Sequence, residues 1–257
     1  MKMIIPILML PLLFAIARAE LVTKSVIYED NGATLEGYLA YDNAIAGKRP
    51  GVLVIHEWTG INDYVKGRVE QLAGLGYVAF AADIYGKGIR PKNAEEAAQQ
   101  AGIYRKDRQL MRRRVTAGLE ELRNNELVDT SRIAAIGYCF GGGTVLELAR
   151  SGVRINGVVS FHGNLDTPNV DDAKNIKCKV LVMQGADDPH TKDQVPAFED
   201  EMRKGGVDWE MNIYGGAVHS FTNPSAGNDP SKGAAYNAEA DHRSWEAMKQ
   251  FFAEIFK

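Results

Sequence analysis

The stretch Gly137–Gly143, which reads GYCFGGG, decides how this chain folds. It directly follows a short apolar run, residues 133–138, and leads into a run of helical periodicity, residues 143–150. Glycines at such a junction let the chain reverse sharply, because side chains at their positions would collide with the strand or the helix. The stretch therefore predicts a strand, a tight turn with Cys139 at its tip, and a helix that begins beside the thiol.

Outward from this turn the chain repeats one pattern: short apolar runs without alternation, each followed by helical periodicity. Such runs are typical of strands buried on both faces, and we expect them at 51–56, 77–82, 133–138, 157–161, 180–184 and 209–214. The expected helices are 65–75, 94–123, 143–150, 193–204 and 238–252. Repeated strand and helix units predict an α/β fold with a doubly wound, mostly parallel sheet flanked by helices.

The N-terminal part differs, because residues 21–28 and 33–41 alternate apolar with polar side chains around Asp30-Asn31-Gly32. This pattern predicts a β-hairpin ahead of the parallel sheet. The 257 residues carry 45% hydrophobic and 25% charged side chains and contain no linker, which indicates one domain. The only glycine- and proline-enriched stretch, 223–233, is interpreted as a surface loop.

The formal net charge is −3, so the chain has no general attraction for nucleic acid or anionic membranes. The basic segment 105–114 is a candidate nucleic-acid patch. However, Leu110, Val115, Leu119 and Leu122 form an apolar stripe through its helix, which favours a solvated charged face on a packed helix. We therefore expect no nucleic-acid partner.

The first 19 residues have the features of a secretory signal. A basic start, Met1-Lys2, leads into the apolar run 4–17, and Ala17-Arg18-Ala19 supplies small residues for cleavage, with Arg18 as a departure. The run is shorter than the roughly 20 residues that a membrane-spanning helix requires, which disfavours an uncleaved anchor. We expect a signal peptide at 1–19 and a mature domain at 20–257, periplasmic or secreted, without stable membrane association.

The turn also suggests the chemistry, because Gly-x-Cys-x-Gly between a strand and a helix matches a nucleophile elbow with cysteine as nucleophile. Unpaired N–H groups at the start of the helix favour a thiolate, and the N–H of Phe140 can bind an oxyanion. The alternative is a buried, inert cysteine. A disulfide with Cys178 is excluded, since Cys139 ends one strand and Cys178 begins another, whereas a disulfide needs Cα atoms within roughly 7 Å.

An elbow of this kind requires a base and an acid later in the chain, each in a loop after a strand. Residues 180–184 lead into Gly185-Ala186-Asp187-Asp188-Pro189, and residues 209–214 lead into a glycine-rich turn that contains His219. We expect His219 as the base and Asp188 as the acid that orients it, with Asp187 as the alternative acid. A surface histidine in that turn is the other interpretation of His219.

Four blocks resemble the dienelactone hydrolase (carboxymethylenebutenolidase) family of the α/β-hydrolase superfamily along most of the mature chain. They are His56-Glu57-Trp58-Thr59-Gly60 with Asn62-Asp63-Tyr64, then Ala82-Asp83-Ile84-Tyr85-Gly86, then Gly137-Tyr138-Cys139-Phe140-Gly141-Gly142, and His219-Ser220-Phe221. The resemblance implies an α/β-hydrolase fold, a role for Glu57 in activating the thiol, and the N–H of Trp58 as second oxyanion donor beside Phe140. Without it, Glu57 would be interpreted as a solvated loop acid.

The sequence also departs from the family pattern, in which arginines hold a substrate carboxylate after the Asp-Leu-Tyr-like block and after His-Ser-Phe. The latter positions are Thr222 and Asn223 here. Any such clamp has to use Lys87 or Arg90, which follow Tyr85, and lysine is a weaker substitute for the bidentate arginine. We expect Tyr85, Lys87 and Arg90 to contact substrate, and dienelactone itself is disfavoured.

These observations predict an enzyme that hydrolyses small carboxylic esters or lactones through a thioester on Cys139, with no metal or organic cofactor. Its partner is a small molecule, and a monomer is expected although the sequence leaves the oligomeric state open. One alternative is a non-catalytic binding protein with the same fold. A redox-sensing thiol is less favoured, because no resolving cysteine is expected near Cys139.

Overall fold

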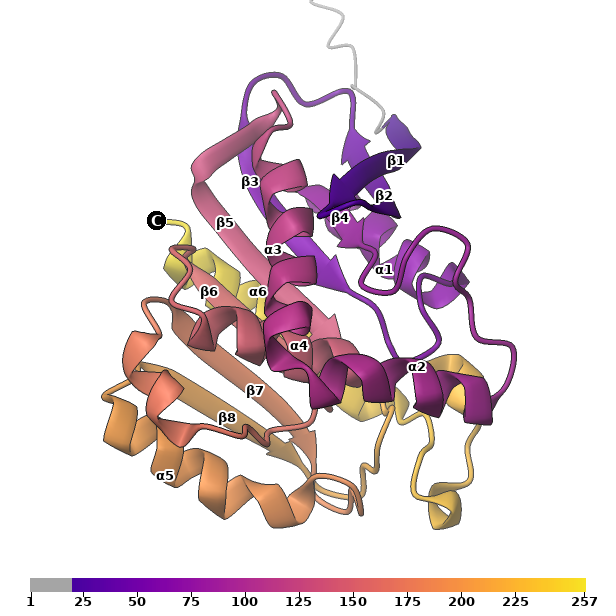
Figure 1. Cartoon of the computed structure of the whole chain (residues 1–257), viewed down its shortest axis with the longest axis vertical. Helices are drawn as coiled ribbons and strands as arrows, with labels where there is room; N and C mark the ends of the chain where they lie inside the picture. The colour runs from indigo at the N-terminus through magenta and orange to yellow at the C-terminus, as the bar shows by residue number, and fades with distance from the viewer. Residues whose placement is uncertain (1–19) are drawn as a thin grey trace, which may run out of the picture.

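A computed structural model describes residues 20–257, and its centre is a single eight-stranded sheet in the order β1-β2-β4-β3-β5-β6-β7-β8. The strands are β1 Leu21–Asp30, β2 Ala33–Asp42, β3 Arg49–Ile55, β4 Val78–Ala82, β5 Val128–Tyr138, β6 Gly157–Phe161, β7 Lys179–Gly185 and β8 Trp209–Tyr214. The strands from β3 to β8 run parallel, whereas β1 and β2 form the antiparallel hairpin at one edge. This arrangement confirms the predicted mixed sheet and its N-terminal hairpin (Figure 1).

In the described part of the chain, six α-helices flank the sheet, and Figure 1 shows their arrangement. They are α1 Asp63–Gly74, α2 Ala94–Lys106, α3 Arg108–Arg123, α4 Phe140–Arg150, α5 Val195–Gly205 and α6 Ala238–Ile255, with short 3₁₀ turns at Val170–Asn175, Lys192–Gln194, Pro224–Ala226 and Pro230–Lys232. Buried side chains of α2, α3, α4 and α5 share one core cluster, and those of α1 and α6 share the other. Helices therefore cover both faces of the sheet, as the strand and helix repeat predicts. Within residues 20–257, no helix is long and apolar enough to cross a membrane.

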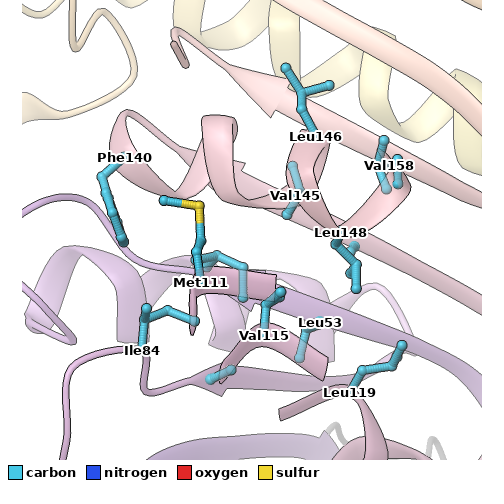
Figure 2. Packing of buried hydrophobic residues seen from close by; sticks show 14 of the residues in the cluster. Leu53, Ile84, Met111, Val115, Leu119, Phe140, Val145, Leu146, Leu148 and Val158 are labelled. Atoms are coloured by element: carbon cyan, nitrogen blue, oxygen red, sulfur yellow. The ribbon is translucent and has the colours of Figure 1, made fainter. Parts of the chain in front are cut away.

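The core under α3 and α4 holds the elbow in place. Val115 of α3 and Val145 of α4 are fully buried, and both belong to the cluster that includes Leu53 of β3 and Val158 of β6 (Figure 2). Each fully buried side chain of this kind contributes about 1.5–3 kcal/mol relative to an exposed one. The helix that follows Cys139 is therefore anchored along its length, which leaves little freedom for the turn before it.

The prediction of one helix over 94–123 is wrong, because the chain forms α2 and α3 with a break at Asp107. Asp107 has φ −117° and ψ 85°, outside the helical region, and its side chain accepts a hydrogen bond from the N–H of Leu110. An aspartate in this position caps a new helix. The break changes the direction of the chain, so that α2 crosses the end of the sheet at which the parallel strands finish, whereas α3 runs along the strands (Figure 1).

The interpretation of 105–114 as a solvated charged face is also wrong for most of its arginines. Arg112 pairs with Glu147 and Asp172, Arg114 with Asp30, and Arg108 with a further acid on a distant loop. The acids lie far away in the sequence, so periodicity within the segment does not reveal them. The expected apolar stripe is largely confirmed, since its members Val115, Leu119 and Leu122 are buried.

Candidate active site

The turn between β5 and α4 has the geometry of a nucleophile elbow. Cys139 adopts φ 53° and ψ −114°, a backbone conformation that L-residues rarely occupy. A Cβ on Gly137 would lie 2.0 Å from the carbonyl oxygen of Gly141, and a Cβ on Gly141 would lie 2.2 Å from that of Ile55. These two glycines are required by the tight turn, and the turn presents the thiol at the carboxyl end of β5.

Cys139, His219 and Asp188 form a continuous line of polar contacts. His219 Nε2 lies 3.1 Å from Cys139 Sγ, and His219 Nδ1 lies 2.8 Å from Asp188 Oδ2. Asp188 is fully buried, whereas the neighbouring Asp187 is exposed and accepts a hydrogen bond from the N–H of Gly216. The structure therefore brings Asp188, and not Asp187, against the imidazole. Both cysteines are free thiols, in agreement with the sequence analysis.

The electrostatics of this line favour a charged imidazole. Burial opposes protonation of His219, but a negative charge on Cys139 and the hydrogen bond to Asp188 outweigh it and raise the pKa of His219 to about 10. Burial tends to raise the pKa of Asp188, yet its bond to His219 holds that pKa below the usual value. The arrangement can hold a thiolate and imidazolium pair with Asp188 ionised behind it.

The loop after β8 holds the backbone of His219 on both sides. The N–H of His219 donates to the carbonyl of Gly233, and its own carbonyl accepts from the N–H of Ala235. Ser220, the next residue, has a φ of 56°. The stretch 223–233, expected as a surface loop, contains two short 3₁₀ turns and returns the chain to His219. His219 is therefore fixed as part of a folded loop rather than exposed on a free turn.

Glu57, in the loop after β3, is buried beside the same site and accepts a hydrogen bond of 2.6 Å from Asn223 Nδ2. Burial raises its pKa above the ordinary value, while Asn223 and the charges of His219 and Arg68 act in the opposite direction. Asn223 is one of the two positions after His219-Ser220-Phe221 at which the family resemblance implies an arginine. In this chain a neutral amide, and not a guanidinium, holds the carboxylate.

The two expected oxyanion donors have free N–H groups. Phe140 is the first residue of α4, and within residues 20–257 neither its N–H nor that of Trp58 donates to a protein acceptor. The backbone of Trp58 is held in place, because its carbonyl accepts from the hydroxyl of Tyr85. His56 supports the same loop, with Nδ1–H donating to the carbonyl of Glu57.

These groups line one cavity of about 580 Å³ at the carboxyl ends of the strands. Glu57, Trp58, Cys139, His219 and Asn223 all contribute to its wall. In the described part of the chain, no group of three or more His, Cys, Asp or Glu residues has a metal-binding arrangement. The volume and mixed lining of the cavity suit a small organic molecule beside the thiol of Cys139.

The three residues expected to bind substrate do not line this cavity. Tyr85 is buried, and its hydroxyl donates a hydrogen bond to the carbonyl of Trp58. Arg90 donates to the carbonyls of Gly86 and Ile89 and lines a separate groove. Lys87 is exposed. The chain turns away after Tyr85, because Gly86 takes a φ of 132° and the N–H of Lys87 pairs with β2.

Sequence reasoning missed Arg105 of α2, which does line the cavity. Its Nη2 donates to Asn164 Oδ1 at 2.9 Å, and within residues 20–257 it forms no ion pair with an acid. The available signal was Asp107, a residue type that caps helices, two residues after Arg105. Because 94–123 was interpreted as one continuous helix, the end of α2 at the cavity, which carries Arg105, was not predicted.

The eight-stranded sheet, the elbow and the order of Cys139, Asp188 and His219 along the chain define the α/β-hydrolase class. Residues 35–256 match the model of the dienelactone hydrolase family, and the chain belongs to this family. Family membership makes it a hydrolase of carboxylic esters or lactones.

Several solved structures are similar to this chain over nearly their whole length, two of them at 40% sequence identity or more. A dienelactone hydrolase-like promiscuous phosphotriesterase from metagenomic libraries, P91, is 42% identical, with 93% of this chain and 100% of that chain covered and a TM-score of 0.87. A protein named m3DLH is 40% identical, with 92% and 99% covered and a TM-score of 0.89. The dienelactone hydrolase from Anabaena variabilis is 20% identical, covering 92% and 99% at a TM-score of 0.66, and this likeness concerns the fold alone.

Proposed function

We propose that this protein hydrolyses small carboxylic esters or lactones with Cys139 as nucleophile, His219 as general acid and base, and Asp188 as the group that orients His219. The contact of 3.1 Å between Cys139 Sγ and His219 Nε2, at the wall of a cavity, carries the proposal. The hydrogen bond that His219 Nδ1–H donates to Asp188 keeps this nitrogen protonated, which leaves Nε2 available to exchange a proton with the sulfur and with the substrate.

The reaction has two halves. In the first, the thiolate attacks the carbonyl carbon, and the free N–H groups of Trp58 and Phe140 stabilise the oxyanion. The bond from carbon to the ester oxygen then breaks, and His219 donates its proton to the leaving alkoxide, which leaves a thioester on Cys139. In the second half, His219 takes a proton from water, the resulting hydroxide attacks the thioester, and the acid departs as the sulfur regains its charge.

We further propose that Glu57 takes part in generating the thiolate. A buried carboxylate with a raised pKa can accept a proton from a neutral thiol in the same cavity, and an anionic substrate would favour the protonated form of Glu57. The hydrogen bond from Asn223 supplies no charge, so the carboxylate is less strongly stabilised than it would be by arginine.

Arg105 is the residue that we propose for recognition of an anionic group on the substrate, in place of Lys87 and Arg90. Its guanidinium lines the cavity and lies 6.0 Å from the centroid of the Phe140 ring, and its only side-chain hydrogen bond among the described residues is to the neutral Asn164. A charge-assisted bond to a carboxylate is worth about 1.5–3 kcal/mol, which is roughly 10- to 100-fold in kcat/KM.

Two variants test the role of Arg105 on a matched pair of lactones, one with and one without a carboxylate. Arg105→Gln is expected to lower kcat/KM for the carboxylated lactone by roughly 10- to 100-fold and to leave the neutral lactone within about twofold. Arg90→Gln is the control, because Arg90 lies outside the cavity. Equal losses on both lactones in Arg105→Gln would contradict the proposal.

The reaction itself is tested with Cys139→Ala and a panel of aryl esters, lactones and carboxylated lactones. The panel includes a phosphotriester, because the relative P91 is described as a promiscuous phosphotriesterase. We expect loss of all turnover in the variant, and unchanged hydrolysis would rule out the thioester route. The non-catalytic alternative predicts instead that alkylation of Cys139 is no faster than that of an ordinary thiol with a pKa near roughly 8.5.

The export signal at 1–19 lies outside the described residues, and export remains a proposal supported by the sequence pattern. Expression of the full chain in a bacterium should give a periplasmic or secreted protein whose N-terminal residue, determined by mass spectrometry, is Glu20. A cytoplasmic product that retains residues 1–19 would contradict it.

A further inference from the structure

His162 is a second histidine beside the nucleophile that the proposed reaction does not use. It directly follows β6, is fully buried, and has a φ of 41°. Its Nδ1 accepts a hydrogen bond from the N–H of Cys139 at 3.2 Å, and its Nε2 lies 2.7 Å from Thr222 Oγ1. One imidazole thus touches the backbone of the nucleophile at one nitrogen and the loop of His219 at the other.

The protonation of His162 follows from its partners. A backbone N–H can only donate, so Nδ1 of His162 is the acceptor and the proton of the neutral ring resides on Nε2, from which it donates to Thr222. Burial lowers the pKa of His162 well below its ordinary value, and the charges of His219 and Arg68 act in the same direction. His162 therefore stays neutral when the neighbouring His219 carries a proton.

Thr222, three residues after His219, is fully buried and held from several sides. Its hydroxyl lies 2.6 Å from the hydroxyl of Tyr64, and its carbonyl accepts a hydrogen bond of 2.7 Å from Arg68 Nη2. Both partners belong to α1. The point at which His162 contacts the loop is consequently a rigid one, because it is anchored to a packed helix.

We propose that His162 and Thr222 form a positioning link that sets the distance and angle between Cys139 and His219. Cys139 follows β5 and His219 lies in the loop after β8, and the link joins the backbone of Cys139 to that loop without lining the cavity. The N–H of Cys139 also donates to the carbonyl of Phe161 at 3.0 Å, so the bond to His162 is not needed to satisfy this donor. The hydrogen bond to His162 therefore acts on the position of Cys139 relative to His219. The inference rests on the proposed function of Cys139 and His219.

The test replaces the hydroxyl of Thr222 and then restores it. Thr222→Val keeps the shape but removes the hydroxyl that accepts from His162 Nε2–H and contacts the hydroxyl of Tyr64, whereas Thr222→Ser keeps this hydroxyl. A small displacement of a reacting group lowers the rate of the chemical step much more than it lowers binding, so we expect Thr222→Val to lower kcat by about tenfold with KM unchanged. Thr222→Ser should return kcat to within about twofold of the parent enzyme.

The matched control is Ser160→Ala, which removes another buried hydroxyl near the elbow. The hydroxyl of Ser160 has no hydrogen-bond partner within residues 20–257, and a Cβ added to Gly142 would lie 2.6 Å from it. We expect this variant to keep kcat within about twofold of the parent. A loss in Ser160→Ala equal to that in Thr222→Val would show a general packing effect and overturn the proposal.

A second readout separates this inference from the proposed function. The rate of alkylation of Cys139 by iodoacetamide as a function of pH reports the coupling of the sulfur to His219 without any substrate. A changed pH profile in Thr222→Val, restored in Thr222→Ser, supports the link even if the natural substrate is not an ester. An unchanged profile together with unchanged kcat overturns the link, whereas turnover by Cys139→Ala overturns the proposed function instead.

Discussion

Two buried imidazoles, those of His219 and His162, lie with ring centroids 5.3 Å apart, yet their surroundings shift their pKa values in opposite directions. Burial disfavours the charged form of both. Around His219, Asp188 and a negative charge on Cys139 more than offset that effect. Around His162 the hydrogen-bond partners are a backbone N–H and a hydroxyl, and neither carries charge. The identity of the partners, and not the depth of burial, decides which histidine can hold a proton.

The largest expected effect comes from removing the anion behind His219. Asp188→Asn keeps the shape but lets an amide face the imidazole, which favours the wrong tautomer and removes the stabilisation of the charged ring. We expect kcat to fall by roughly 10³- to 10⁴-fold. Asp187→Asn is the control, since Asp187 is exposed and, within residues 20–257, its carboxylate accepts a hydrogen bond only from the N–H of Gly216. Comparable losses in both variants would contradict the assignment of Asp188.

A second prediction concerns the charge on the other side of His219. Cys139→Ala removes the anion that raises the pKa of His219 most and leaves Asp188 as the hydrogen-bonded carboxylate, so this pKa should fall from about 10 toward its ordinary value. An NMR titration of the imidazole signals measures this change. Cys178→Ala, at the other buried cysteine, should leave the titration of His219 unaltered. The comparison fails if the pKa of His219 is the same with and without the thiol.

A smaller effect is expected on stability in acid. The pKa of His162 is well below the ordinary 6.5, and that of the fully buried His56 is lowered to about 4. The folded state then binds fewer protons than the unfolded state, so stability is fully present above about pH 6.5 and falls as the pH drops from there toward the folded pKa. His219 has the opposite sign, because its contribution is present below pH 6.5 and is lost as the pH rises through about 10.

Chemical denaturation between pH 7 and pH 4 measures this acid dependence. Each site contributes at most about 1.4 kcal/mol per pH unit to the slope. His162→Asn should reduce the slope, since asparagine does not titrate and tolerates the positive φ of this position. A slope that is identical in His162→Asn and the parent would show that His162 is not held neutral in the folded state.

Much of the fold could be predicted from local patterns, because a buried parallel strand needs an unbroken apolar run and a helix on its face needs an apolar stripe. The strands Gly157–Phe161 and Trp209–Tyr214 have the predicted bounds. The helix break at Asp107 was missed, since the residues on both sides have helical periodicity and only a capping hydrogen bond separates the two helices. The ion pairs of Arg112 and Arg114 were missed for a related reason, because their partners come from other elements.

The sequence by itself indicated the proposed reactive centre, since the tight turn needs glycine at 137 and 141, and a cysteine, an aspartate and a histidine each follow an apolar strand in the chain order of the α/β-hydrolase class. The tertiary structure decided which of two adjacent aspartates faces His219, brought Arg105 to the cavity in place of Lys87 and Arg90, and joined His162 to Thr222. The physical reason is the range of the interactions. Steric limits on the backbone act between neighbours in the chain, whereas charge recognition and buried hydrogen bonds depend on groups that meet only when the sheet has formed.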